Sequence, residues 1–146
     1  MLTGLVLAAL VSTADEQKVA NPYDRVESKR VVPMLTEAIR FATFEKNEKA
    51  HRDQKAWLMK TAADLGFVAR DAGKVTEIEL AATVEPAVAV LGLVVHGDVQ
   101  PVDAKAWKFP PFEGRADKEF VYGRGAADDK GPLIQALMAM HALRES

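Results

Sequence analysis

The sequence contains no cysteine, and this absence removes several kinds of chemistry at once. Disulfide scaffolds, thiolate nucleophiles and every cysteine-based zinc site are excluded. The formal net charge is −2, and acidic and basic residues are interspersed, so there is no basic stripe that could neutralise a phosphate backbone. We therefore expect no nucleic acid partner, and any bound metal must be held by histidine and carboxylate side chains.

Long hydrophobic runs are also scarce. Residues 1–14 hold an apolar core about ten residues long, followed by the small residues Ser12, Thr13 and Ala14. This is the size of a secretory signal peptide and too short for a membrane span, although no basic residue precedes the core. The alternatives are a buried helix or an N-terminal strand. We expect a signal peptide at residues 1–14, a linker at 15–24, and a secreted or periplasmic protein with no stable membrane span after leader removal.

The whole sequence is 49% hydrophobic and 27% charged, which is typical of a globular domain. Apolar residues spaced three or four apart predict one amphipathic helix over residues 26–44, bent at Pro33, and a second over 54–65. Gly66 follows the second helix where a C-terminal cap belongs. The strongly charged segment 44–53 between them is expected to be a loop.

The periodicity then changes to that of strands. Residues 76–84 alternate between apolar and polar, which predicts a half-exposed strand. Residues 87–95 are almost continuously apolar and rich in valine, which is typical of a strand buried on both faces of an α/β sheet. A short strand is expected at 120–122 and a largely buried helix at 132–143. The pattern predicts an α/β fold with a mixed central sheet flanked by helices.

The first candidate site is His96-Gly97-Asp98, at the end of the strand predicted to be buried. Ligands of α/β proteins gather beyond the carboxyl ends of strands, and a neutral imidazole is a good zinc ligand. Asp98 could hold the second ring nitrogen of His96. Taken alone, the motif is a weak signal, and the favoured interpretation would be a loop histidine beside a solvated aspartate.

The second candidate site is the glycine-rich segment from Gly123 to Gly131, between a short strand and a helix. A carboxylate just before the helix would lie near its positive end. The alternatives are a turn capped by Asp128 or Asp129, or a dinucleotide loop. The dinucleotide loop is disfavoured because Asp128 would set a negative charge against the pyrophosphate.

Together the two segments resemble the dizinc exopeptidase family, which includes acetylornithine deacetylase, succinyl-diaminopimelate desuccinylase, glutamate carboxypeptidase, aminoacylase and the carnosinase-like dipeptidases. The resemblance extends from about residue 91 to 143, and its Asp-Asp-Lys-Gly-Pro sequence is most similar to the dipeptidase branch. The residues that carry it are His96-Gly97-Asp98-Val99, Pro101, Trp107, Pro111-Phe112 and the run from Tyr122 to Pro132.

The resemblance implies a role for three side chains. His96 would be a ligand of one zinc ion, Asp98 the catalytic carboxylate that orients the site, and Asp128 the carboxylate that bridges two zinc ions. Cobalt or manganese would suit the same donors. Hydroxide bound to the metals would attack the scissile carbonyl. The resemblance also implies a cis peptide bond between Asp128 and Asp129. Asp129 stands where many relatives have methionine.

The expected activity is removal of an amino acid from a dipeptide or short peptide. The alternatives are an N-acyl amino acid deacylase or glutamate carboxypeptidase, or a non-catalytic binding or assembly module. The family's general base belongs to a Glu-Glu pair, and no Glu-Glu pair occurs in the sequence. The resemblance implies that residues 25–146 are the N-terminal portion of a catalytic domain, inactive alone, and that the base, further ligands and a dimerisation domain lie beyond Ser146.

Other residues near these motifs have structural interpretations. Trp107, Pro111 and Phe112 are predicted to pack as an aromatic and proline-rich loop rather than to contact substrate. Arg124 is expected to fix its turn, and Lys130 to be a surface or packing residue at the helix start. For His51 and His141, solvent exposure or ordinary packing is expected, because neither has a carboxylate at ligand spacing.

Overall fold

A computed structural model of the chain describes residues 28–81 and 90–145. The expected signal peptide at 1–14 and linker at 15–24 lie outside the described residues. Three helices dominate the rest: α2 (Ser28–Ile39), α3 (Glu48–Asp64) and α4 (Lys130–Arg144). None of the helices in the described ranges is long and apolar enough to cross a membrane.

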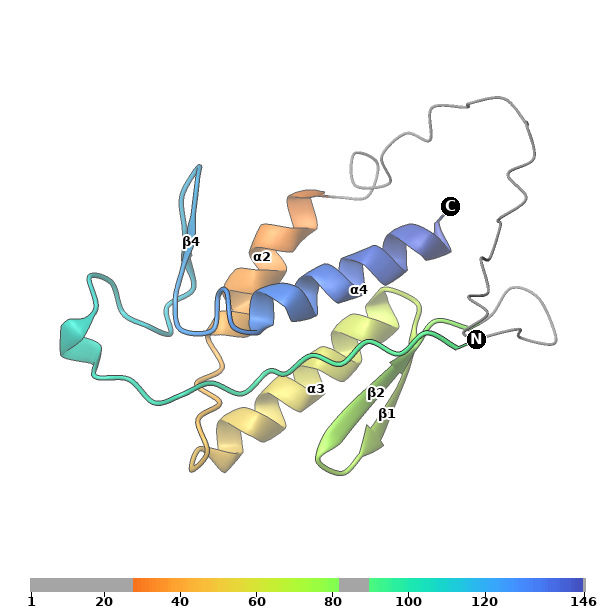
Figure 1. Ribbon diagram of the computed structural model, residues 1–146, viewed down its shortest axis with the longest axis horizontal. Helices are drawn as coiled ribbons and strands as arrows, with labels where there is room; N and C mark the ends of the chain where they lie inside the picture. The colour runs from red at the N-terminus through yellow and green to blue at the C-terminus, as the bar shows by residue number, and fades with distance from the viewer. Residues whose placement is uncertain (1–27, 82–89, 146) are drawn as a thin grey trace, which may run out of the picture.

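The helices α2 and α4 lie side by side, with α3 beneath them in Figure 1. Burial of the apolar faces of all three helices holds them together. On α2, Met34 and Ala38 are buried, one position away from the predicted stripe through Val31 and Leu35, which are partly buried against the core. The buried core consists of Met34, Ala38, Ala62, Leu65, Phe67, Leu133, Ile134, Leu137 and Met138.

The prediction of a loop at residues 44–53 is wrong over its second half, because α3 begins at Glu48. Asn47 caps the helix with its side-chain oxygen, which accepts a hydrogen bond from the Ala50 amide at 3.2 Å. Charged residues of the first turns pair four apart, as Lys49 does with Asp53 at 2.5 Å. The predicted end is confirmed: α3 stops at Asp64, and Gly66 has a φ of 79°.

Two small antiparallel sheets and a short 3-10 helix, η1 (Ala104–Ala106), complete the described structure. β1 (Val68–Ala72) pairs with β2 (Val75–Glu79), so the strand predicted at 76–84 is confirmed at its start, and its partner β1 was not predicted. β3 (Arg115–Ala116) pairs with β4 (Val121–Tyr122). The short strand predicted at 120–122 corresponds to β4, whereas β3 was not predicted. Helices with small antiparallel strands confirm the α/β class expected from the sequence.

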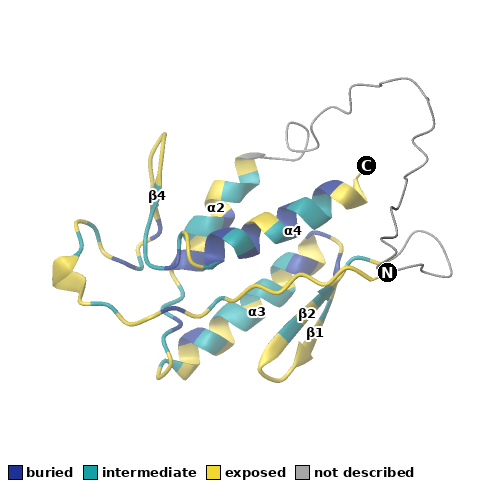
Figure 2. Cartoon of the chain, in the orientation of Figure 1, coloured by how far each residue is buried: buried dark blue, intermediate teal, exposed yellow. Residues whose placement is uncertain are grey.

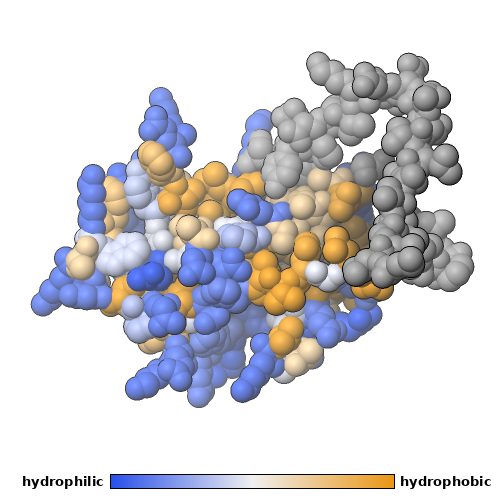
Figure 3. Space-filling view, in the orientation of Figure 1, coloured by the Kyte–Doolittle hydropathy of each residue, from blue (hydrophilic) through white to orange (hydrophobic). Residues whose placement is uncertain are grey.

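The strand predicted at residues 87–95 is not formed in its described part. Residues 90–95 are extended but unpaired, and Val90 and Val94 are 92% and 98% exposed. Figure 2 shows this stretch in yellow as it crosses in front of α3, and Figure 3 shows hydrophobic side chains on the same face. A strand buried on both faces needs neighbouring strands and covering layers, and no described strand runs beside this one.

The helix predicted at 132–143 is confirmed as α4, which starts two residues earlier. Leu133, Ile134, Leu137 and Met138 are buried, whereas Leu143 is 67% exposed. At the far end, Arg144 donates a hydrogen bond of 2.6 Å to the Leu65 carbonyl, just beyond α3. A basic side chain therefore joins the C-terminal end of α4 to that of α3.

Candidate metal centre

The two predicted motifs meet at His96, whose ring nitrogens each face a carboxylate. Nδ1 lies 3.2 Å from Oδ1 of Asp98, and Nε2 lies 3.2 Å from Oδ1 of Asp128. The extended segment supplies His96 and Asp98, and the turn before α4 supplies Asp128. All three side chains are exposed, so they can be reached from solvent.

The spacing of His96 and Asp128 fits two ligands of one metal ion. Donor atoms about 2.0–2.2 Å from a tetrahedral zinc ion lie about 3.3–3.6 Å apart, close to the separation of Nε2 and the Asp128 oxygen. Asp98 faces the opposite ring nitrogen, where carboxylates commonly orient metal-binding histidines. Within residues 28–81 and 90–145, no group of three or more His, Cys, Asp or Glu side chains could hold a metal ion.

The electrostatic surroundings of His96 favour positive charge. Desolvation lowers the pKa of His96. The charge of Asp98 and a hydrogen bond to the Asp98 backbone carbonyl raise it, and so do the charges of Asp129 and Asp128. The net result is that the pKa of His96 lies above its ordinary value. A cluster that stabilises imidazolium also attracts a cation, because the same negative field acts on both.

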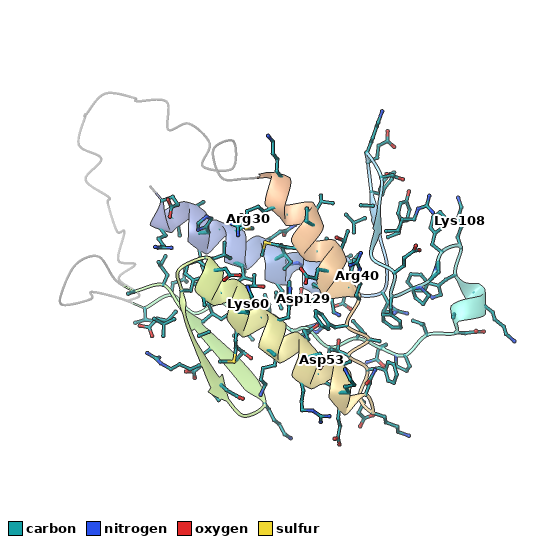
Figure 4. The ribbon with its side chains drawn as sticks, turned by 180° about the vertical axis from the view of Figure 1, so that it is seen from behind. Arg30, Arg40, Asp53, Lys60, Lys108 and Asp129 are labelled. Carbon is teal, nitrogen blue, oxygen red and sulfur yellow. The ribbon has the colours of Figure 1, made fainter. Side chains whose placement is uncertain are left out.

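Asp129 also belongs to this centre, a role that the sequence did not predict. It precedes α4, where a carboxylate usually caps the helix, but it makes no side-chain cap bond. Instead Oδ2 of Asp129 accepts a hydrogen bond of 3.0 Å from the His96 amide. Figure 4 shows Asp129 at the start of α4, near the end of α2. The expected cis peptide bond between Asp128 and Asp129 is confirmed.

The turn before α4 packs closely against the extended segment at Gly125. This residue has a φ of 87°, and a Cβ atom there would lie 2.7 Å from the Val99 side chain. A larger residue would therefore be strained and would push the two motifs apart. The carbonyl of Gly125 also accepts a bond of 3.0 Å from the Lys130 amide.

Lys130 is fully buried, which decides between its two predicted roles in favour of packing. Its Nζ atom donates to the carbonyls of Ala38 at 2.8 Å and Phe41 at 2.6 Å. Burial lowers the pKa of Lys130 to about 8, because desolvation disfavours its charge, although the Asp98 carboxylate acts in the opposite direction.

Thr43 is a second buried polar residue that the sequence did not single out. Its hydroxyl donates a hydrogen bond of 2.6 Å to the Gly97 carbonyl. Its carbonyl accepts one of 3.1 Å from the Val99 amide. The sequence predicts Thr43 near the end of the helix over residues 26–44, whereas α2 already ends at Ile39, so only the fold reveals these contacts.

The aromatic loop has contacts that agree with a structural role. The Arg124 guanidinium lies 5.3 Å from the Trp107 ring centre, and the Arg124 amide donates to the carbonyl of buried Pro111 at 2.7 Å. A neighbouring hollow of about 400 Å³ is lined by Trp107, Lys108, Phe109, Pro110, Val121, Tyr122 and Gly123. The other histidines lie in helices: Nε2 of His51 faces the Phe44 carbonyl at 3.2 Å, and Nδ1 of His141 is buried without a hydrogen-bond partner.

Comparison with known proteins adds an independent observation. Residues 92–146 match the peptidase family M20/M25/M40. The match begins four residues before His96 and includes the four residues of the centre, which are His96, Asp98, Asp128 and Asp129.

Individual relatives align with part of the chain. The chain is 44% identical over 57 residues to the Beta-Ala-Xaa dipeptidase of Lactobacillus delbrueckii subsp. lactis, covering 38% of this chain and 12% of that protein. It is 44% identical over 78 residues to carboxypeptidase S of Saccharomyces cerevisiae, covering 48% and 14%. It is 37% identical over 59 residues to the N-fatty-acyl-amino acid synthase/hydrolase PM20D1 of Mus musculus, covering 40% and 12%. The aligned part thus spans about an eighth of the length of these relatives.

Proposed function

We propose that residues 92–146, which match the peptidase family M20/M25/M40, contribute to a metal-dependent hydrolase that releases an amino acid from a dipeptide or short peptide. The observation that carries this proposal is the position of His96 between two carboxylates, at 3.2 Å from each. These carboxylates come from two separate segments of the chain. A scaffold protein would have no need to bring the three groups together.

In this proposal each side chain has a defined task. His96 and Asp128 hold metal through Nε2 and a carboxylate oxygen. Asp98 fixes the imidazole ring through Nδ1, and Asp129 fixes the backbone through the His96 amide. A bound pair of zinc ions would activate water and stabilise the negative charge that develops on the scissile carbonyl. Other parts of the protein would supply the general base and the further ligands.

The substrate class is proposed from the relatives. One is named a Beta-Ala-Xaa dipeptidase and another a carboxypeptidase, which favours short peptides. Similarity to an N-fatty-acyl-amino acid synthase/hydrolase favours a second candidate, hydrolysis of N-acyl amino acids. Both reactions cleave an amide bond next to an amino acid, so the same metal centre would serve either.

The test is hydrolysis by the full-length gene product loaded with Zn²⁺, with dipeptides and N-acyl amino acids as substrates. His96→Ala and Asp128→Asn should each lower kcat/KM by at least about a thousandfold, because metal stabilisation of the transition state is lost. Asp98→Asn should cost about 10–100-fold, as is usual for a residue that orients a ligand.

The matched control is His51→Gln, which changes a histidine in α3 that faces a backbone carbonyl. It should retain the activity of the unmodified protein. Full activity in the His96→Ala protein would contradict the proposed metal site. Binding of Zn²⁺ without turnover of either substrate class would favour the non-catalytic binding or assembly module instead.

A further inference from the structure

Thr43 forms hydrogen bonds with the backbone on both sides of Asp98. Its hydroxyl donates to the Gly97 carbonyl at 2.6 Å, and its carbonyl accepts a hydrogen bond of 3.1 Å from the Val99 amide. Asp98 therefore sits between two anchored peptide groups. Thr43 is itself fully buried, so water cannot easily replace these bonds.

Lys130 connects the Thr43 turn to the helix that follows Asp128. Its ammonium donates hydrogen bonds to the carbonyls of Ala38 and Phe41 at 2.8 and 2.6 Å. The Phe41 carbonyl also accepts a hydrogen bond of 2.9 Å from the Thr43 amide, so this one oxygen links Lys130 to Thr43. The backbone of Lys130 lies two residues after Asp128. This chain of bonds runs from the start of α4 through the turn to the segment that carries His96.

We infer that Thr43 is a positioning residue of the metal centre, and that Lys130 holds the Thr43 turn against the start of α4. Together they set the separation of His96 and Asp128 before a metal ion arrives. The inference rests on the proposed function, since it assigns both residues to that same site. Preformed ligands bind more tightly because less freedom is lost on binding.

The experiment measures the affinity of the full-length gene product for Zn²⁺ by competition with a chromophoric chelator. Thr43→Val keeps the shape of the side chain and removes the hydroxyl, and it should weaken binding about tenfold or more. Thr43→Ser restores the hydroxyl and should stay within about threefold of the unmodified protein, well short of that loss.

The matched control is Thr36→Val, which removes a hydroxyl bonded to the Pro33 carbonyl at 2.8 Å within α2. It should leave the Zn²⁺ affinity unchanged. Unmodified affinity in folded Thr43→Val, or an equal loss in Thr36→Val, would overturn the inference. The second result would mean that any lost threonine hydroxyl loosens the domain.

Two further measurements separate this inference from the proposed function. If His96→Ala and Asp128→Asn bind Zn²⁺ normally, the proposed function fails; if they lose it while Thr43→Val does not, only the positioning role fails. Should Thr43→Val not fold, amide hydrogen exchange of the metal-free unmodified protein still decides. The Val99 amide should exchange at least about tenfold more slowly than that of exposed Lys118, and equal rates would refute the positioning role.

Discussion

Lys130 carries a charge into the interior of the domain, and its two hydrogen bonds to carbonyls compensate part of the desolvation cost. Its pKa of about 8 indicates that burial works against the charged form. Burial of this charge therefore costs free energy, and the contacts that Lys130 makes offset the cost. Those contacts join α2 and α4 at the end where the metal centre lies.

We predict that Lys130→Met lowers the free energy of unfolding by about 1–3 kcal/mol. Methionine fills a similar volume but leaves the carbonyl of Phe41 without its ammonium donor, and relief of the desolvation penalty offsets only part of this loss. The measurement is urea or thermal unfolding of the full-length gene product.

The control for this prediction is Lys60→Met on α3, labelled in Figure 4. Lys60 is 75% exposed and pairs with Asp64 at 2.5 Å. An exposed pair of this kind contributes at most about 1 kcal/mol. Equal stability changes in the two variants would mean that the buried ammonium has no special role.

At the scale of elements, α3 depends on its N-terminal cap. The Asn47 oxygen accepts the Ala50 amide at 3.2 Å, and its nitrogen donates to the Ala42 carbonyl at 3.0 Å. We predict that Asn47→Ala destabilises the domain by about 1 kcal/mol, because an amide of the first turn loses its acceptor. Asn47→Asp keeps the acceptor and should recover most of this loss.

Unfolding curves of both variants provide the measurement, with amide exchange at Ala50 as a local readout. Faster exchange at Ala50 in Asn47→Ala than in Asn47→Asp would agree with the cap. If the two variants exchange alike, the cap bond contributes nothing to the helix.

The helices were predictable where burial imposes a period. Ala62 and Leu65 face the core at helical spacing, and Gly66 marks the end of α3. The start of α3 was missed because exposed charges carry no apolar period, although the pairing of Glu48 with Arg52 four residues later is itself a helical signal. Strand β1 was missed because most of its residues are exposed and polar residues interrupt it.

The candidate site was predictable from side-chain chemistry, whereas its support was not. His96, Asp98 and Asp128 carry the donor atoms, so a motif can reveal them. Thr43 lies far from them in the sequence, and its contacts depend on how α2 ends. Asp129 resembles an ordinary helix cap until the fold turns its carboxylate to the His96 amide.

At the scale of the whole molecule, residues 90–95 present unpaired backbone and exposed valine and leucine side chains. Such a segment is a ready template for strand pairing. Because it leads directly into His96, pairing would also fix the position of the candidate metal ligand. The apolar run predicted a strand here, but residues 90–95 form none, because an apolar run does not reveal which strand must lie beside it.

Export is a second property of the whole molecule. We predict that the exported mature protein begins at or near Asp15, because residues 1–14 have the length and apolarity of a signal peptide. N-terminal sequencing of protein recovered from the periplasm or the medium is the measurement. An intact Met1 on that protein would contradict the prediction.

The last prediction concerns the 146 residues when they are produced alone. A zinc ion held by His96 and Asp128 receives two protein ligands, whereas catalytic zinc sites usually have three and structural ones four. The rest of its shell would be water, so we expect weak binding, no stoichiometric pair of metal ions and negligible hydrolysis of dipeptides. The measurement is metal content after dialysis, together with turnover, beside the full-length gene product under the same conditions. Two tightly bound zinc ions and turnover from the 146 residues would show that the ligands described here suffice, and that the proposed contribution from other parts of the protein is not needed.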